Sequence, residues 1–280
     1  MAGHRKFLIF AAVALAAPLA GCESISGMAS RRGPGYAETS AADPKAVEAN
    51  IDSLNRVVET HPNDPEAYNT RGVAYAKIGR FDQAIGDFSQ AIKLDPHHAS
   101  AYTNRALAER QTGANDAALA DFGHAIDANP NHGPAYLGRA NLLRAQGQLD
   151  SALRDLDQAI RINPENAQSF HARGLIYQKQ GQNERAITDF DNAIDRDPFS
   201  AAPYQARGQS QLALGRNDKA IEDFNAALNV DNHLADAWAG LGVAYEKKGD
   251  RQKAAENYQR ALSLNSDEPV ARAGMSRVKG

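Results

Sequence analysis

The sequence predicts an all-α fold, a solenoid in which antiparallel helix pairs stack one on another. From Pro65 onward the chain repeats itself every 34 residues, and a fixed period of this length is typical of repeat architectures. Aromatic residues make up only 7% of the 280 residues, which suits thin two-helix layers better than one thick core. The formal charge of −3 and the lack of a basic segment predict no nucleic-acid partner.

The first residues predict a secretory signal peptide over residues 1–21. His4, Arg5 and Lys6 precede the apolar run 7–17, which is too short to span a bilayer as a mature helix. The following Leu-Ala-Gly-Cys, which ends at Cys22, resembles the lipobox of bacterial lipoproteins. The resemblance implies cleavage before Cys22 and fatty acylation, palmitate included, at its thiol. The alternative is an ordinary signal peptide with a chance cysteine.

A lipid anchor and a tether follow from this interpretation. Cys22 is the single cysteine of the chain, so no internal disulfide is possible. Residues 22–43 are rich in Ser, Gly, Ala and Pro and predict a flexible tether. In some lipoproteins an acidic residue after the cysteine, chiefly Asp, retains the protein in the inner membrane. Because this chain has Glu23 there, we expect the periplasmic face of the outer membrane rather than the inner membrane.

The remaining chain divides into a capping helix, six repeats and a tail. Residues 44–62 predict an N-terminal capping helix that begins after Asp43, with an apolar stripe that includes Ile51 and Val58. Residues 269–280 predict a C-terminal cap. The six repeats, numbered from position 1 to 34, are 65–98, 99–132, 133–166, 167–200, 201–234 and 235–268.

Each repeat carries the same residue types at the same positions. Position 4 is aromatic, positions 8, 20 and 27 are small, and position 24 is large. Small residues let two helices approach closely. Glycine at position 15 predicts the end of the first helix. Proline at position 32 predicts the end of the second, although Asn232 and Ser266 replace it late in the array.

This pattern resembles the tetratricopeptide repeat (TPR) family from Pro65 to Glu268. The resemblance implies a right-handed superhelical solenoid of six helix pairs between capping helices. One departure is position 11, normally apolar, where Glu109 and Gln211 stand. Arg105, one turn earlier, is expected to neutralise Glu109, and Gln211 is expected to form a local hydrogen bond.

Positions 7 and 23 predict an ion pair within each of the first five repeats. Position 7 is Arg and position 23 is Asp in all five, and the last repeat loses both, with Leu241 and Asn257. Joint loss favours contact between the two, while the alternative is a row of arginines for an anionic ligand. The predicted pairs are Arg71 with Asp87, Arg105 with Asp121, Arg139 with Asp155, Arg173 with Asp189, and Arg207 with Asp223.

The family resemblance also implies a binding groove lined by the first helices. In the family, positions 2, 5, 6, 9, 12 and 13 face a concave groove that suits an extended peptide or a partner helix. The carboxylate clamp of some relatives is absent, because only Asn104 matches it. Carried over, the groove comprises Asn69, Val73, Lys77, Thr103, Asn104, Leu107, Arg110, Asn141, Arg144, His171, Gln178, Lys179, Gln205 and Gln209.

Four bases at position 12 or 13 form a stripe along this groove: Lys77, Arg110, Arg144 and Lys179. We name them the basic stripe. An acidic or C-terminal segment would complement it. The alternative is that bases near a helix C-terminus merely complement the helix dipole.

The sequence predicts neither an enzyme nor a cofactor or metal site. It contains no glycine-rich phosphate loop and no G-x-S-x-G motif. His97 and His98 could suggest a metal site, but no cysteine or i,i+4 histidine pair supports it. These histidines are therefore expected in solvated turns.

The expected function is a membrane-anchored scaffold in the bacterial envelope. The chain resembles TPR lipoproteins that hold peptidoglycan hydrolases and periplasmic proteases at the outer membrane, which implies envelope proteins or peptide segments as partners. A pilotin or assembly lipoprotein for a type IV pilus or secretin is the alternative. A third class is a protein that binds peptides or wall fragments without an enzyme partner.

Overall fold

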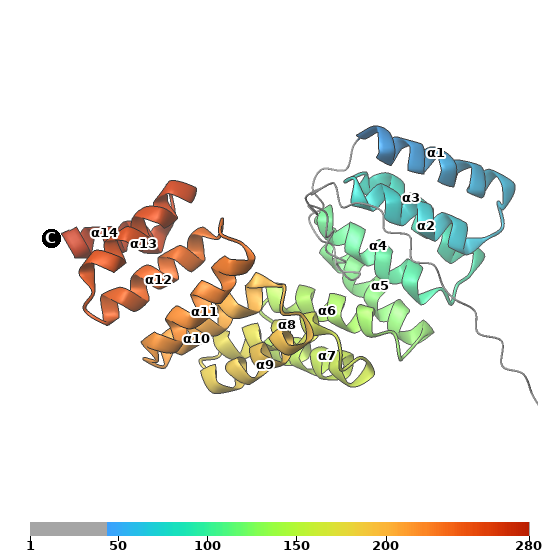
Figure 1. Ribbon diagram of the computed structural model, residues 1–280. Coiled ribbons are helices and arrows are strands. Elements are labelled where there is room, and N and C mark those ends of the chain that lie inside the picture. Colours follow the sequence, from blue (N-terminus) through green and yellow to red (C-terminus); the bar gives the residue numbers. More distant parts are fainter. Residues whose placement is uncertain (1–43, 280) are drawn as a thin grey trace, which may run out of the picture. The chain divides into compact units, whose positions relative to one another are not determined.

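The computed structural model describes residues 44–279, which form fourteen α-helices (Figure 1). The predicted signal peptide 1–21, the predicted lipidation site Cys22 and the predicted tether 22–43 lie outside the described residues. The helices are α1 (Pro44–Thr60), α2 (Pro65–Lys77), α3 (Phe81–Leu94), α4 (Ala99–Gln111), α5 (Asn115–Ala128), α6 (Gly133–Ala145), α7 (Leu149–Ile162), α8 (Ala167–Lys179), α9 (Asn183–Arg196), α10 (Ala201–Ala213), α11 (Asn217–Val230), α12 (Ala235–Lys247), α13 (Arg251–Leu264) and α14 (Pro269–Lys279).

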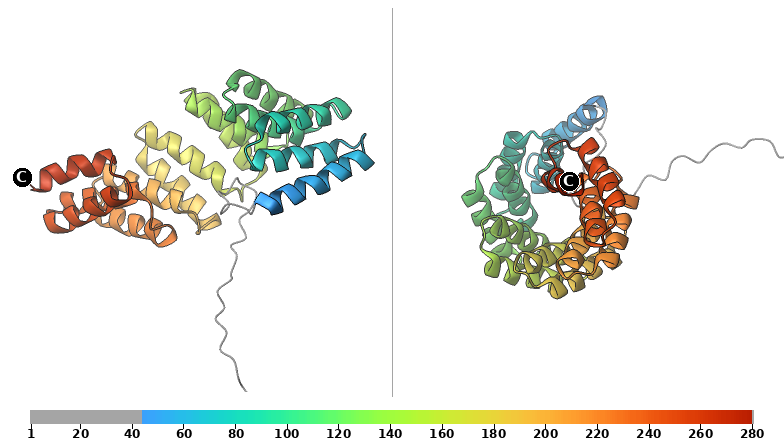
Figure 2. Two further views of the ribbon diagram at one scale, coloured as in Figure 1. Left: turned by 90° about the horizontal axis from the view of Figure 1, so that it is seen from above. Right: turned by 90° about the vertical axis from the view of Figure 1, so that its left-hand side faces the viewer.

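Helices α2–α13 form six pairs that stack in chain order as a right-handed superhelical solenoid (Figures 1 and 2). The even-numbered helix of each pair is the first helix, and it packs against its own second helix and the second helix of the preceding pair. The backbones of first helices also approach those of the first helices in neighbouring pairs, whereas within residues 44–279 the backbones of successive second helices stay farther apart. Because the first helices of neighbouring pairs lie closer together than the second helices do, the stack curves with its first helices on the inner side.

Small and large side chains alternate in the core as the repeat pattern predicts. Every alanine at position 20 is 0% exposed, and so is the large residue at position 24 of each repeat, from Phe88 to Tyr258. A Cβ atom added to Gly72 would lie 2.6 Å from the Phe88 ring, and one added to Gly174 would lie 2.6 Å from the Phe190 ring. The small residue at position 8 therefore sets how closely the two helices of a layer approach.

The turn inside each repeat depends on its glycine. The six glycines at position 15 have φ between 74° and 83°, in the left-handed region that other residues rarely adopt. The turn between repeats depends on position 31, where the side chain of an Asp or Asn accepts a hydrogen bond from the backbone N–H two residues later. Because Asp231 and Asn265 make this bond, the turn forms with Asn232 or Ser266 in place of proline.

The terminal helices extend the stack at both ends. Helix α1 packs against α2, where a second helix of a preceding pair would lie, and its Ile51 and Val58 are 4% and 8% exposed. Helix α14 packs against α12 and α13 as a further first helix would. A Cβ at Gly274 would collide with the ring of Tyr258. Within the residues described, no helix is both long and apolar enough to cross a membrane.

Candidate functional site

Each arginine at position 7 lies against the aspartate at position 23 of its own repeat. In the first four repeats Nε and Nη2 of the arginine donate to the two carboxylate oxygens at 2.6–2.8 Å. The five aspartates are only 3–7% exposed. We name the five pairs the arginine ladder. Bidentate geometry is the strongest form of this contact, and it leaves these arginines engaged inside the protein.

The third donor of most ladder arginines reaches the preceding layer, which the sequence analysis did not anticipate. Nη1 of Arg71 donates to Asn55 at 3.0 Å, and Nη1 of Arg105 donates to Ser89 at 3.0 Å. Arg173 and Arg207 bond in the same way to Asp157 and Asp191. The acceptor always stands at position 25 of the preceding layer, so a polar residue there was the available signal.

Arg139 has no such partner because position 25 of the layer before it is Gly123. Its Nε and Nη2 atoms hold Asp155 at 2.7 and 2.8 Å. The ladder is therefore interrupted between the second and third repeats, although every layer keeps its own pair.

The five ladder pairs differ in how well the arginine stabilises the negative charge of its aspartate. Hydrogen bonds to Asp155 raise the pKa of Arg139 against the opposing effect of burial. In the fifth repeat both donors of Arg207 reach the same oxygen, Oδ1 of Asp223. Burial raises the pKa of Asp223 despite the hydrogen bonds from Arg207, so this pair is the least complete of the five.

The expected ion pair between Arg105 and Glu109 is absent. Arg105 gives Nε and Nη2 to Asp121 and Nη1 to Ser89. Within residues 44–279, Oε2 of Glu109 is buried without a hydrogen-bond partner. Burial, together with the charge of Asp121, raises the pKa of Glu109 against the weaker opposing effect of the Arg105 charge. The expectation was wrong because Asp121 already occupies the guanidinium.

Two of the predicted groove residues contribute no open surface. Asn69 is 6% exposed, donates to Glu66 and accepts from Asn104 at 2.9 Å. Thr103 is 3% exposed, and its hydroxyl donates to the backbone oxygen of Ala99. Asn69 and Asn104 instead link α2 to α4, so they fix the spacing of the first helices from within.

The other predicted groove residues divide between packing and exposure. Val73 and Leu107 are half-buried against the cores of their layers. Gln178 donates to the Ala206 carbonyl at 2.8 Å and to the Ser210 hydroxyl at 2.9 Å, which joins α8 to α10. Half-buried side chains are Asn104, Arg110, Asn141, Arg144, His171 and Gln205, and exposed ones are Lys77, Lys179 and Gln209.

The basic stripe lacks protein partners, in contrast to the ladder. Its four members, each in the last turn of α2, α4, α6 or α8, form no ion pair and no side-chain hydrogen bond with any described residue. Nε of Arg144 is buried without a partner in the same part of the chain. Helix termini of this polarity favour bases, but the unused donors of Arg144 remain available for an anion.

His171 lies beside this stripe and responds to it. Burial, and to a lesser degree the charge of Arg144, lowers the pKa of His171 to about 4. Its ring lies 5.8 Å from that of Phe190. His171 is therefore neutral at physiological pH, and an anion bound at Arg144 would raise its pKa.

Models of the tetratricopeptide repeat match residues 65–98, 99–132, 167–200 and 235–268, and a TPR repeat model matches 140–181 and 208–249. The chain belongs to the tetratricopeptide repeat family. No curated protein sequence matches the chain significantly.

Solved TPR structures share the fold. Cut9 of the APC/C Cut9–Hcn1 hetero-tetramer is 19% identical, with a TM-score of 0.72 over 84% of this chain and 46% of that chain, so the chain spans about half the length of Cut9. YrrB, a TPR protein with an unusual peptide-binding site, is 25% identical, with a TM-score of 0.57 over 68% of this chain and 97% of YrrB. PilW, a type IV pilus biogenesis factor, is 18% identical, with a TM-score of 0.67 over 77% of this chain and 98% of PilW.

The TPR repeats place no metal-ligand cluster in the part of the chain that the structure describes. His98 lies in the turn after the first repeat, with Nε2 3.1 Å from Glu66 Oε2. His132 lies in the next such turn, where burial and the neighbouring His98 lower its pKa. Both histidines therefore lie in local contacts of the turns between repeats.

Proposed function

We propose that this TPR protein is a scaffold of the bacterial envelope that binds an acidic or C-terminal peptide segment along its first helices. The observation that carries the proposal is the basic stripe. Four cations on four successive first helices have no partner within the described residues, whereas the ladder arginines of the same helices are engaged. Carboxylates, which acidic side chains and a peptide C-terminus carry, form short, charge-assisted hydrogen bonds with arginine and lysine donors.

The anchoring part of the proposal rests on the amino-acid sequence. Cys22, at the end of a Leu-Ala-Gly-Cys motif, would carry the lipid, and the outer membrane is proposed as the site. Several acyl chains hold a protein stably, whereas one does so marginally. A Cys22→Ser variant is expected to leave the membrane fraction, as measured by immunoblotting of fractionated envelopes. Retention of the variant in that fraction would count against lipidation.

The scaffold role implies that the chain positions other proteins and catalyses nothing itself. Its proposed partners are envelope proteins, including a peptidoglycan hydrolase or a protease, held through a peptide segment. The similarity of YrrB, whose structure has a peptide-binding site, supports peptide binding at the level of the fold.

The alternative is an assembly lipoprotein for a type IV pilus or secretin. The fold that the chain shares with PilW favours this candidate. A knockout strain separates the two proposals. Loss of secretin assembly would favour the pilus role, whereas intact secretin with misplaced hydrolase activity would favour the adaptor.

An affinity pull-down from detergent-solubilised envelope tests the groove. The wild type is compared with an Arg110→Glu/Arg144→Glu variant, and prey are identified by mass spectrometry. The control is Arg154→Glu/Arg161→Glu, which changes the charge equally at exposed positions of the second helix α7. We expect the groove variant to lose its prey and the control to keep it.

Folding of both variants is checked by circular dichroism. Prey retained by a folded groove variant would contradict the proposal. Equal loss in both variants would show that only overall charge matters, which would also contradict it.

A further inference from the structure

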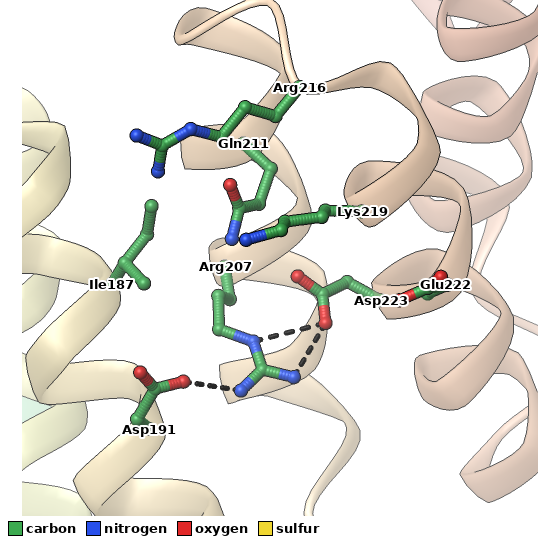
Figure 3. A pocket seen from close by; sticks show the side chains of 8 residues that line it. All are labelled: Ile187, Asp191, Arg207, Gln211, Arg216, Lys219, Glu222 and Asp223. Carbon is green, nitrogen blue, oxygen red and sulfur yellow. Dashed lines mark hydrogen bonds and ion pairs between the residues drawn. The ribbon is translucent and has the colours of Figure 1, made fainter.

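A pocket of about 290 Å³ opens between α9, α10 and α11, outside the predicted groove residues (Figure 3). Two ladder residues, Arg207 and Asp223, form one wall, and Arg207 also bonds to Asp191. The lining residues are Ile187, Asp191, Arg207, Gln211, Arg216, Lys219, Glu222 and Asp223.

In the fourth repeat the corresponding space is filled by a tyrosine of the chain itself. Tyr177, at position 11, is 7% exposed and belongs to a hydrophobic cluster against which Leu153 of the preceding layer packs. Arg185, at position 19, lies 3.8 Å from the centre of the Tyr177 ring, and its Nη2 donates to the phenol oxygen at 2.6 Å. The Tyr177 ring is therefore accompanied by a cation and by an aliphatic residue that packs against the same cluster.

The sixth repeat has the same arrangement. Tyr245, again at position 11, packs in one cluster with Ile221 of the preceding layer. Nζ of Lys253, at position 19, lies 5.3 Å from the centre of the Tyr245 ring. A cation and an aliphatic residue thus accompany the ring in both neighbours of the fifth repeat, the fourth and the sixth.

The fifth repeat keeps the aliphatic residue and the cation but lacks the ring. Ile187 and Lys219 stand at the matching positions, and both line the pocket. Position 11 is Gln211, which is 6% exposed and whose Oε1 has no hydrogen-bond partner among the described residues. The expected local hydrogen bond of Gln211 is therefore missing at this oxygen.

The two arginines that line the pocket are neutralised by ion pairs. Arg207 is engaged by Asp191 and Asp223, and Arg216 pairs with Glu184. Lys219 and Glu222, opposite in charge and three residues apart on α11, are left along the lining. Such a lining suits a neutral ligand with an aromatic face for the cation and a hydrogen-bond donor for the Gln211 oxygen.

We propose that this pocket binds a tyrosine side chain presented by a partner polypeptide. The ring lies against Lys219 and beside Ile187, as the rings of Tyr177 and Tyr245 lie against Arg185 and Lys253 in the flanking repeats. The amide of Gln211, whose Oε1 has no partner among the described residues, turns toward the ring and accepts a hydrogen bond from the phenol O–H. The site does not overlap the basic stripe, so the proposal stands independently of the proposed function.

The test is an NMR titration of the full chain with labelled isoleucine and leucine methyl groups, using N-acetyl-L-tyrosinamide as probe. We expect a saturable shift of the Ile187 methyl signal. Because one neutral hydrogen bond is lost, N-acetyl-L-phenylalaninamide is expected to bind roughly fivefold more weakly. Lys219→Met is expected to weaken the tyrosine probe by roughly fivefold through loss of the cation–ring contact.

Two variants exchange the position-11 residues of the fourth and fifth repeats. Gln211→Tyr restores a ring at position 11 and is expected to abolish the Ile187 shift. Tyr177→Gln opens the matching space beneath Arg185 and is expected to create a second response at the Leu153 methyl group. If Tyr177→Gln fails to fold, the Gln211→Tyr and Lys219→Met results still decide the proposal.

Three outcomes of the NMR titration would overturn the proposal that this pocket binds a tyrosine side chain. The first is an Ile187 signal unmoved by the tyrosine probe. The second is equal binding of N-acetyl-L-leucinamide, which would show that no aromatic ring is recognised. The third is much tighter binding of free p-cresol than of the tyrosine amide, which would assign the pocket to a small phenol instead of a polypeptide.

Discussion

Two arginines of helix α6, five residues apart, show how one residue type serves two purposes. Arg139 donates Nε and Nη2 to Asp155 at 2.7 and 2.8 Å and is held inside its layer. Arg144 makes no ion pair within residues 44–279, and its Nε is buried without a partner. The partner across the layer therefore decides whether a cation of this array supports the fold or is open to a ligand.

The largest expected effect is loss of a ladder acid. Asp155→Ala leaves Arg139 half-buried without its carboxylate, and Asp155 itself is 7% exposed. Removing one partner of a buried pair costs about 3 kcal/mol. We expect the free energy of unfolding, measured by urea titration, to fall by about that amount.

A double-mutant cycle and a control variant test whether Arg139 and Arg144 differ in this way. Arg139→Ala combined with Asp155→Ala is expected to cost less than the sum of the two single changes, because the second change removes an uncompensated charge. Arg144→Ala in the same helix is expected to change stability by less than about 0.5 kcal/mol. Strict additivity in the cycle, or an equal cost for Arg144→Ala, would contradict the distinction between ladder and stripe.

The second effect is a pH dependence at the stripe. The pKa of His171 is about 4 in the folded protein and about 6.5 in an unfolded chain. As the pH falls below 6.5 the unfolded state takes up the proton first, so the folded state loses stability until the pH reaches about 4. We expect this part of the loss to be roughly 1–3 kcal/mol.

The measurement is urea unfolding between pH 7 and pH 4 for the wild type and His171→Gln. The variant is expected to lose less stability over this range, while His97→Gln, an exposed turn residue, serves as control. Identical pH profiles for wild type and His171→Gln would show that the His171 pKa is not lowered.

The smallest effect concerns the interruption of the ladder at Gly123. A Cβ atom there would meet nothing within 4 Å, and glycine inside a helix is less stable than alanine by roughly 0.5–1 kcal/mol. Gly123→Ala is expected to stabilise the protein by that amount. Gly123→Asp would also place a carboxylate near Nη1 of Arg139, as Asp157 is placed for Arg173.

The two variants are compared by thermal unfolding at low and high salt. The Gly123→Asp variant is expected to match or exceed Gly123→Ala at low salt by a few tenths of a kcal/mol. It is expected to fall below Gly123→Ala in about 1 M salt because the ion pair is screened. A salt-independent difference would show that the introduced carboxylate and Arg139 do not interact.

Sequence reasoning predicted the helix pairs because their signals are local and repeated. Glycine at position 15 has the positive φ that the pattern requires, and the position-24 side chains are buried throughout. It missed the acceptors at position 25 because each of these contacts joins two different layers, whereas each ladder pair lies within one repeat. It assigned the end of the second helix to proline at position 32, whereas the Asp or Asn at position 31 holds the turn that follows in every repeat.

The candidate site was less accessible to sequence reasoning. Family positions placed Asn69 and Thr103 in the groove, but both are buried and their polar groups bond within the protein. For Gln211, sequence reasoning expected only a local hydrogen bond and did not predict a pocket beside it. The pocket depends on Ile187 and Lys219, which come from two other helices.

The sequence by itself determined the all-α class, the 34-residue period and the membership in the TPR family, because helix propensity, glycine turns and small-to-large packing act over short distances. Only the tertiary structure decided which charged groups are neutralised and which remain open to a ligand. The reason is that a hydrogen bond requires its donor and its acceptor to lie about 3 Å apart. The stacking of the repeats decides which donors and acceptors reach that distance.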